Sequence, residues 1–232
     1  MIFRQLFESE TSTYTYLMGC PLTHRALLID PVASEVDAYI AVLNALDLTL
    51  VYTLETHVHA DHITGSGLLR ERLGSHSVVH QAAGTLCPDL LVSDGVRLQL
   101  GSLEWTVLHT PGHTQSCVSY RFEDRVFTGD ALLIGGCGRT DFQQGNPGQL
   151  YDSIHQKLFT LPPDTLVYPG HDYQGHTVSS IRQEMQKNSR LGPRIDRSAF
   201  VELMNNLDLP LPKHIHAAVP ANLACGKVDV TP

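Results

Sequence analysis

The chain has 232 residues, of which 42% are hydrophobic and 17% are charged, and its formal net charge is −8 at pH 7. This composition is typical of a globular enzyme and excludes a disordered chain or a coiled coil. The acidic balance, without a local run of lysine and arginine, excludes nucleic acid as a partner. Because no apolar stretch reaches the roughly 18 residues of a membrane span, we expect no membrane segment and a single domain over residues 1–232.

The first half of the chain predicts a strand meander followed by alternating helices and strands. A helix is expected from Ser34, whose side chain can cap it, to about Asp47. The segment "LTLVYTLET", residues 48–56, predicts a buried strand, and the short helix after it should end at Gly74. Runs of apolar, aromatic and β-branched residues predict the three initial strands, at residues 2–7, 13–18 and 26–29.

The second half repeats the pattern of strands first and helices after. Helices are expected at about 149–159 and 177–188. Two similar halves of this kind predict two sheets packed face to face with helices outside, which is a four-layer αββα sandwich of the α/β class. From about residue 207 the chain is proline-rich, and we expect an irregular tail. After the helix that ends at Gly74, further strands are predicted at residues 76–80, 96–100, 103–109, 117–122 and 125–127.

The five cysteines are odd in number, widely spaced and without a C-x-x-C pair. This pattern indicates neither a disulfide framework nor a zinc ribbon, so mostly reduced thiols are expected. The N-terminal residues have neither the apolar core of a signal peptide nor an arginine- and serine-rich leader, which predicts a protein of the cytoplasm. The cysteines are Cys20, Cys87, Cys117, Cys137 and Cys225.

Histidine and aspartate side chains gather at the ends of predicted strands. The segment "THVHADH" carries four of them, and three more follow later strands in "TPGHT", "TGDAL" and "YPGHD". Imidazoles with carboxylates and no thiolate are ligands for zinc, iron or manganese. Five of the 13 histidines fall in these motifs, and we assign the others to surface or hydrogen-bonded positions. The seven candidate ligands are His57, His59, Asp61, His62, His113, Asp130 and His171.

These seven residues reproduce the H-x-H-x-D-H signature and the later ligands of the metallo-β-lactamase superfamily. The resemblance implies the αββα fold. In most hydrolases of that superfamily the seven residues hold two metals, with the residue that matches Asp130 as the bridge between them. The ligand set alone therefore predicts two metals.

A longer resemblance narrows this expectation. Nearly all of residues 1–190 is similar to the persulfide dioxygenases, and "GDALLIGGCGRTDFQQG" is the most discriminating segment. The resemblance implies a bacterial cytoplasmic homodimer that oxidises glutathione persulfide with O2 and water to sulfite and glutathione. It also implies one Fe(II) per chain, held by His57, His113 and Asp130 with three coordination positions open. By the same resemblance, the remaining four side chains orient the ligands and bound water: His59, Asp61, His62 and His171.

Glutathione carries two carboxylates, so an acidic protein needs a local cationic or hydrogen-bonding cradle for it. Arg139 and Tyr173 match the positions where the similar glyoxalase II contacts glutathione. An alternative for Arg139 is a structural ion pair with Asp124 or Asp141. Thr114 is a further candidate for a position near the substrate.

Cys137, in "GGCGRT", allows two interpretations. It is either a small buried residue of a tight loop, which we prefer, or a thiol close to the substrate that accepts a sulfane sulfur. Two other functions remain open at this point. One is a binuclear zinc thioesterase of the glyoxalase II type, and the other is a metal-binding or sulfur-carrier protein that uses Cys137.

Overall fold

The computed structural model describes residues 1–212 and 214–226. The chain divides into two compact units, and the first consists of Met1–Val92, Leu98–Glu104 and Leu211–Pro232. The second consists of Ser93–Arg97 and Trp105–Pro210. One domain over residues 1–232 stays a prediction. In the part of the chain that is described, none of the helices is long and apolar enough to cross a membrane.

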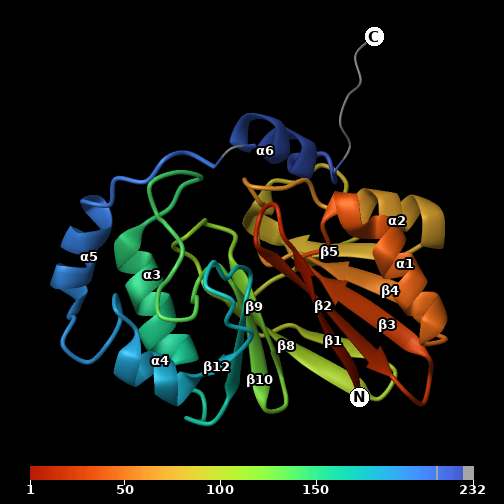
Figure 1. Ribbon diagram of the computed structural model, residues 1–232, viewed down its shortest axis with the longest axis horizontal. Coiled ribbons are helices and arrows are strands. Elements are labelled where there is room, and N and C mark those ends of the chain that lie inside the picture. The colour runs from red at the N-terminus through yellow and green to blue at the C-terminus, as the bar shows by residue number, and fades with distance from the viewer. Residues whose placement is uncertain (213, 227–232) are drawn as a thin grey trace. The chain divides into compact units, whose positions relative to one another are not determined.

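The sheet of the first unit has six strands in the order β1-β2-β3-β4-β5-β6 (Figure 1). Its first three strands form the expected antiparallel meander, whereas β3, β4, β5 and β6 run parallel to one another. Since the carboxyl ends of parallel strands share one edge, the residues after β3 and β4 lie side by side. The strands are β1 (Ile2–Glu8), β2 (Thr13–Cys20), β3 (Arg25–Ile29), β4 (Thr49–Leu54), β5 (His76–His80) and β6 (Leu90–Val92).

Helices α1 (Val36–Ala45) and α2 (Ser66–Leu73) pack against this sheet. Gly74 ends α2 with a φ of 71°, as the sequence predicts for a left-handed C-cap. The predicted cap at Ser34 is wrong, because a 3-10 turn over Ala33–Glu35 comes first and Glu35 occupies the N-cap without a side-chain bond. The apolar contacts between the helices and the sheet include Leu17, Leu28, Tyr39, Leu43 and Leu69.

The second sheet has the strand order β12-β11-β10-β9-β8-β7. Strands β10 and β11 are parallel, so their carboxyl ends also share an edge, whereas β8–β9, β9–β10 and β11–β12 are antiparallel. The strands are β7 (Arg97–Leu100), β8 (Leu103–His109), β9 (Val118–Phe122), β10 (Arg125–Gly129), β11 (Leu166–Pro169) and β12 (Ser179–Ser180).

Helices of the second unit bury a core that includes Leu132, Leu150 and Phe200. Asn146 caps the first of these helices through its side chain, and a π-helical turn over Ile154–Leu158 continues it. The helices are α3 (Pro147–Ser153), α4 (Ile181–Lys187) and α5 (Arg197–Asn205).

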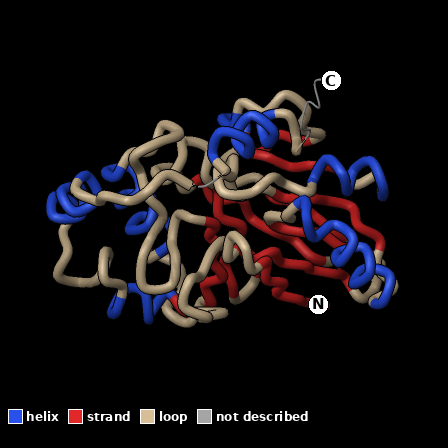
Figure 2. Tube along the Cα trace, turned by 45° about the horizontal axis from the view of Figure 1, so that its top comes forward, coloured by secondary structure: helices blue, strands red, loops and turns tan. Residues whose placement is uncertain are grey.

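The tail differs from the expectation of irregular structure. Helix α6 (Ile215–Leu223) lies within it and is the blue coil between the two grey stretches of Figure 2. Lys213 and residues 227–232, which the prediction also covered, lie outside the described residues. Proline breaks the periodicity of this segment, and Pro220 stands inside the helix, so the helix has a weak signal in the sequence.

A disulfide joins Cys87 and Cys225 across 138 residues of sequence. The expectation of reduced thiols is therefore wrong for this pair, while Cys20, Cys117 and Cys137 are buried and outside any disulfide in the described part of the chain. The two bonded cysteines have no local spacing that marks a pair. Only the fold of the first unit, which contains both, brings them together.

Candidate metal centre

The histidine-rich loop of the first unit starts where β4 ends and finishes at the start of α2. His57, His59 and His62 are 5%, 1% and 4% exposed. Their rings lie in series, with centroid distances of 4.2 Å from His57 to His59 and 4.3 Å from His59 to His62. Each imidazole of the series therefore lies directly beside the next.

Hydrogen bonds define the protonated nitrogen of His57. The Thr56 hydroxyl donates to Asp30 Oδ2 at 2.8 Å and lies 3.0 Å from His57 Nδ1. Since the hydroxyl has a single proton, it accepts from His57 at this second contact, so Nδ1 carries the hydrogen. Nε2 of His57 then keeps its lone pair, which is the form in which an imidazole binds a metal.

His59 lies between two buried carboxylates. Its Nε2 is 3.1 Å from Asp30 Oδ1 and 3.3 Å from Glu55 Oε2. Burial alone would lower the pKa of His59, but the charges and hydrogen bonds of Asp30 and Glu55 outweigh it and raise that pKa well above its usual value. Sequence reasoning missed both carboxylates, although each is the first residue after a parallel strand, which is a signal that could have found them.

The structure brings the rest of the loop's candidate ligands together. Asp61 Oδ2 lies 2.8 Å from His62 Nδ1, and His59, Asp61 and His62 each offer a ligand atom within 4.8 Å of the others. Among the residues that the structure describes, His59 Nδ1 and His62 Nε2 are buried without a hydrogen-bond partner. Buried unpaired nitrogens are costly unless something binds them, and a metal ion fits this donor set.

The second unit holds the later candidates at the ends of its strands. Asp130 follows β10 and His171 follows the parallel strand β11, so the two side chains meet, with His171 Nδ1 2.7 Å from Asp130 Oδ1. His113 Nε2 lies 3.7 Å from Asp130 Oδ2. Two ligand atoms that each bind a metal at about 2.1 Å can be separated by this distance, so His113 and Asp130 suit one shared ion.

Arg139 adopts the structural ion pair that the sequence left open. Its Nε and Nη2 donate to the two carboxylate oxygens of Asp141 at 2.7 and 2.6 Å. The guanidinium also donates to the carbonyls of Leu209 and Pro210, while Asp124 pairs with Arg125 instead. Arg139 therefore anchors the chain after α5, and its predicted contact with glutathione stays a prediction.

The other candidates for substrate contact differ in exposure. Tyr173 is 73% exposed, and its ring is stacked at 6.1 Å from that of His171. Thr114 is buried, with its hydroxyl 3.2 Å from Cys117 Sγ. Cys137 is buried in the apolar core beside Met204, and burial raises the pKa of its thiol to about 11. This environment agrees with the preferred interpretation of Cys137 as a small buried residue.

Comparisons with known proteins agree with these features. A sequence model of the metallo-beta-lactamase superfamily matches residues 10–171. The human mitochondrial persulfide dioxygenase ETHE1 is 47% identical over 229 residues, which cover 97% of this chain and 89% of that protein. The crystal structure of ETHE1 from Myxococcus xanthus is 56% identical with a TM-score of 0.96, and the match covers 98% of this chain and 100% of that one. A hydroxyacylglutathione hydrolase from Rhodospirillum rubrum is 35% identical over 79% of this chain and 72% of that enzyme.

The chain belongs to the metallo-β-lactamase superfamily, and the predicted fold class is confirmed. Within the superfamily it belongs to the persulfide dioxygenases, a family of oxidoreductases, because that similarity runs along nearly the whole chain. The hydrolase of the glyoxalase II type matches a smaller share at lower identity.

Proposed function

We propose that the protein oxidises glutathione persulfide with O2 and water to sulfite and glutathione. The observation that carries the proposal is the similarity to persulfide dioxygenases over 97% of the chain, at 47% identity. The similarity therefore extends beyond the motifs that carry the seven candidate ligands and includes the segment around Arg139 and most of the tail. Cytoplasmic location and a homodimer remain predictions from the sequence.

His57, His113 and Asp130 are the proposed ligands of a single Fe(II). In both histidines Nδ1 is occupied by a neighbouring oxygen, Thr56 Oγ1 in one and the Arg139 carbonyl in the other, so each presents Nε2. Two imidazoles and one carboxylate form the donor set typical of mononuclear non-haem iron oxygenases. Bound there, Fe(II) supplies the electron-transfer chemistry that activation of O2 requires.

The surrounding side chains hold these ligands in place. His171 donates to one oxygen of Asp130 and so turns the other toward His113. We assign His59, Asp61 and His62 to the same supporting role in their own unit. For the glutathione moiety we retain Arg139 and Tyr173 as contacts. The exposure of Tyr173 supports this, and the Arg139 guanidinium must share its donors with Asp141.

A second candidate function is a binuclear zinc thioesterase. The observation that favours it is the group His59, Asp61 and His62, in which Nε2 of His62 is buried without a hydrogen-bond partner. This group has the composition of a site for an additional metal. The similarity to the hydroxyacylglutathione hydrolase points the same way.

Metal analysis and oxygen uptake on the same anaerobically purified protein separate the two candidates. The proposed function predicts one iron per chain and O2 uptake that depends on glutathione persulfide, with sulfite as product. Two zinc ions per chain, hydrolysis of S-lactoylglutathione and no O2 uptake would instead establish the thioesterase. H109Q is a matched control variant, since His109 lies outside the ligand set and bonds to the Gln115 carbonyl.

A further inference from the structure

Asn222, in the last turn of α6, binds the histidine-rich loop at three points. Its side-chain Nδ2 donates to the carbonyls of His59 and His62, each at 2.8 Å. Its Oδ1 accepts from the Thr64 amide, also at 2.8 Å. Residue 222 is 5% exposed and more than 150 positions from the loop in sequence. We infer that Asn222 is a positioning residue of the metal centre, which sets the course of the loop that carries its histidines.

The chemistry of the contact fixes the orientation of the amide. Carbonyl oxygens only accept and the Thr64 N–H only donates, so the Asn222 amide fits in one orientation. An aspartate of the same shape keeps the acceptor but turns a carboxylate oxygen toward two carbonyls. Alanine leaves two carbonyls and one amide buried without partners. Asparagine is therefore suited to this position by both its donors and its acceptor.

The three bonds act on the part of the loop where the imidazoles are attached. The carbonyls of His59 and His62 enclose the turn that brings the His59, Asp61 and His62 side chains together. Because the rings of His57, His59 and His62 lie in series at 4.2 and 4.3 Å, displacement of this turn also displaces His57. The inference rests on the proposed metal centre at this point.

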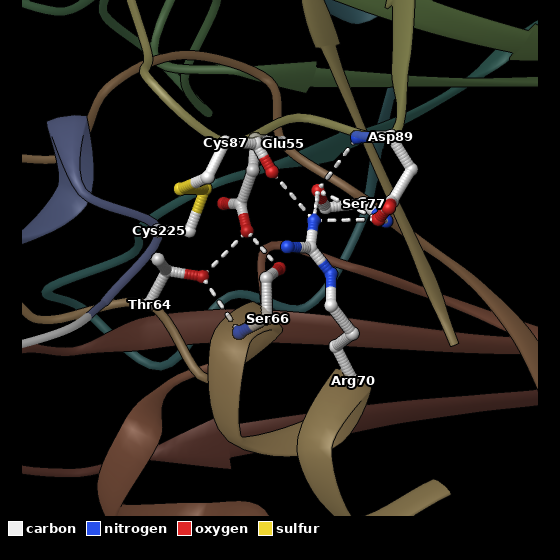
Figure 3. Close-up of a disulfide and its surroundings, with 8 residues drawn as sticks. All are labelled: Glu55, Thr64, Ser66, Arg70, Ser77, Cys87, Asp89 and Cys225. Atoms are coloured by element: carbon white, nitrogen blue, oxygen red, sulfur yellow. Dashed lines mark hydrogen bonds and ion pairs between the residues drawn. A yellow bond between two sulfur atoms is a disulfide. The ribbon is translucent and has the colours of Figure 1, made fainter. Parts of the chain in front are cut away.

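The segment that carries Asn222 is itself fastened to the same unit. The Leu86 amide donates to the Leu223 carbonyl at 2.8 Å. Two residues after Leu223, Cys225 forms the disulfide with Cys87. A Cβ on Gly67 would lie 2.2 Å from the Cys225 carbonyl oxygen, so α2 and the turn after α6 approach too closely for any residue other than glycine at position 67. Figure 3 shows Cys225 next to Thr64 and to Glu55, whose Oε1 accepts from both Thr64 and Ser66.

Titration of the metal-free protein with Fe(II) alone, and with Co(II) alone as a coloured substitute, tests the inference. We expect N222A and N222D to raise the dissociation constant about 10- to 100-fold and to change the visible absorption of bound Co(II). N206A is the matched control: Asn206 also donates Nδ2 to a main-chain carbonyl at the end of a helix, that of Glu202 at 2.8 Å. It should leave both readouts unchanged.

The outcomes separate positioning from stability alone. Variants that bind both metals as the wild type does, with only a lower melting temperature, would overturn the inference. If N222A does not fold, N222D and N222S are titrated instead, and loss of fold in all three would overturn it in favour of a purely structural role. Absence of metal binding by the wild type would contradict the proposed function rather than the role of Asn222.

Discussion

The main chain of Arg139 orients the imidazole of His113. His113 Nδ1 lies 2.6 Å from the Arg139 carbonyl oxygen, and because a carbonyl can only accept, this nitrogen carries the proton. Nε2 is left with a lone pair, 3.7 Å from Asp130 Oδ2. The same residue fixes its own loop through the side-chain pair with Asp141. The conformation of the loop is thus coupled to a proposed metal ligand.

Replacement of His113 by glutamine should remove stoichiometric metal binding. Glutamine fills similar space but lacks an imidazole nitrogen, and a site with three protein ligands loses most of its affinity with one of them. The iron content of H113Q after purification from Fe(II)-supplemented medium measures this loss, and H109Q is the control variant. If H113Q retains the wild-type iron content, His113 is not a ligand.

The variant H171Q distinguishes support of a ligand from direct ligation. In the proposed centre His171 only orients Asp130 through the 2.7 Å contact, so H171Q should still bind one metal per chain, about 10- to 100-fold more weakly. Titration of the metal-free protein gives both the affinity and the stoichiometry. A fall from two metals in the wild type to one in H171Q would show that His171 holds a second ion.

The Arg139–Asp141 pair should stabilise the fold at neutral pH, and this stabilisation should be lost in acid. Hydrogen bonds from Arg139 lower the pKa of the Asp141 carboxyl below its usual value. A carboxyl whose pKa is lower in the folded state stabilises the fold above its unfolded pKa, about 3.9, and this contribution is lost as the pH falls through the folded pKa. Because the Asp141 side chain is 48% exposed, the contribution is about 1 kcal/mol at most.

Urea unfolding of the wild type and D141N across pH 3 to 7 measures this contribution. The wild type should have the higher free energy of unfolding at neutral pH, and the difference should vanish in acid. D152N is a useful comparison, since Asp152 pairs with Arg197 through two oxygens on an exposed helix surface. A difference between wild type and D141N that stays constant with pH would contradict the assignment.

The sequence predicts strands β1 to β5 because these depend on local pattern, and the metal ligands that it indicates stay a prediction. β-Branched and apolar runs define β1 to β5. His57, Asp130 and His171 each follow a strand that has a parallel neighbour, whereas His113 follows β8, which pairs antiparallel with β9. The motifs of the metallo-β-lactamase superfamily indicate in addition that these residues act together in one kind of site. Short-range regularities of this kind remain visible in a single sequence.

Long-range partners are what the sequence does not reveal. Asn222 contacts the histidine-rich loop from a proline-containing helix, and Cys87 forms a disulfide with Cys225. In both cases the partners are far apart in the sequence, and only the tertiary fold brings them together. Spacing alone cannot decide whether Arg139 pairs with Asp124 or with Asp141. The structure pairs it with Asp141, and the same guanidinium also donates to the carbonyls of Leu209 and Pro210. These relationships needed the structure.

Cys137 should be unreactive in the folded protein. Burial raises the pKa of its thiol to about 11, so at pH 8 only about 0.1% is thiolate. Alkylation with iodoacetamide at pH 8, followed by peptide mass spectrometry, should label Cys137 in urea and leave it unlabelled in the native state. Rapid native labelling would instead favour the interpretation of Cys137 as a thiol that accepts sulfur from the substrate.

Reduction of the Cys87–Cys225 disulfide should destabilise the metal-free protein. The bond closes a loop across 138 residues, and constraint of the unfolded chain by such a crosslink is worth about 2–4 kcal/mol. The urea midpoint of the oxidised wild type should therefore fall on addition of a reductant that leaves the midpoint of C87S unchanged. Asn222 lies three residues from Cys225, so the reduced protein should also bind Co(II) more weakly than the oxidised one. Equal midpoints for oxidised and reduced wild type would show that the crosslink adds no stability, and equal Co(II) affinities would show that α6 keeps Asn222 in place without it.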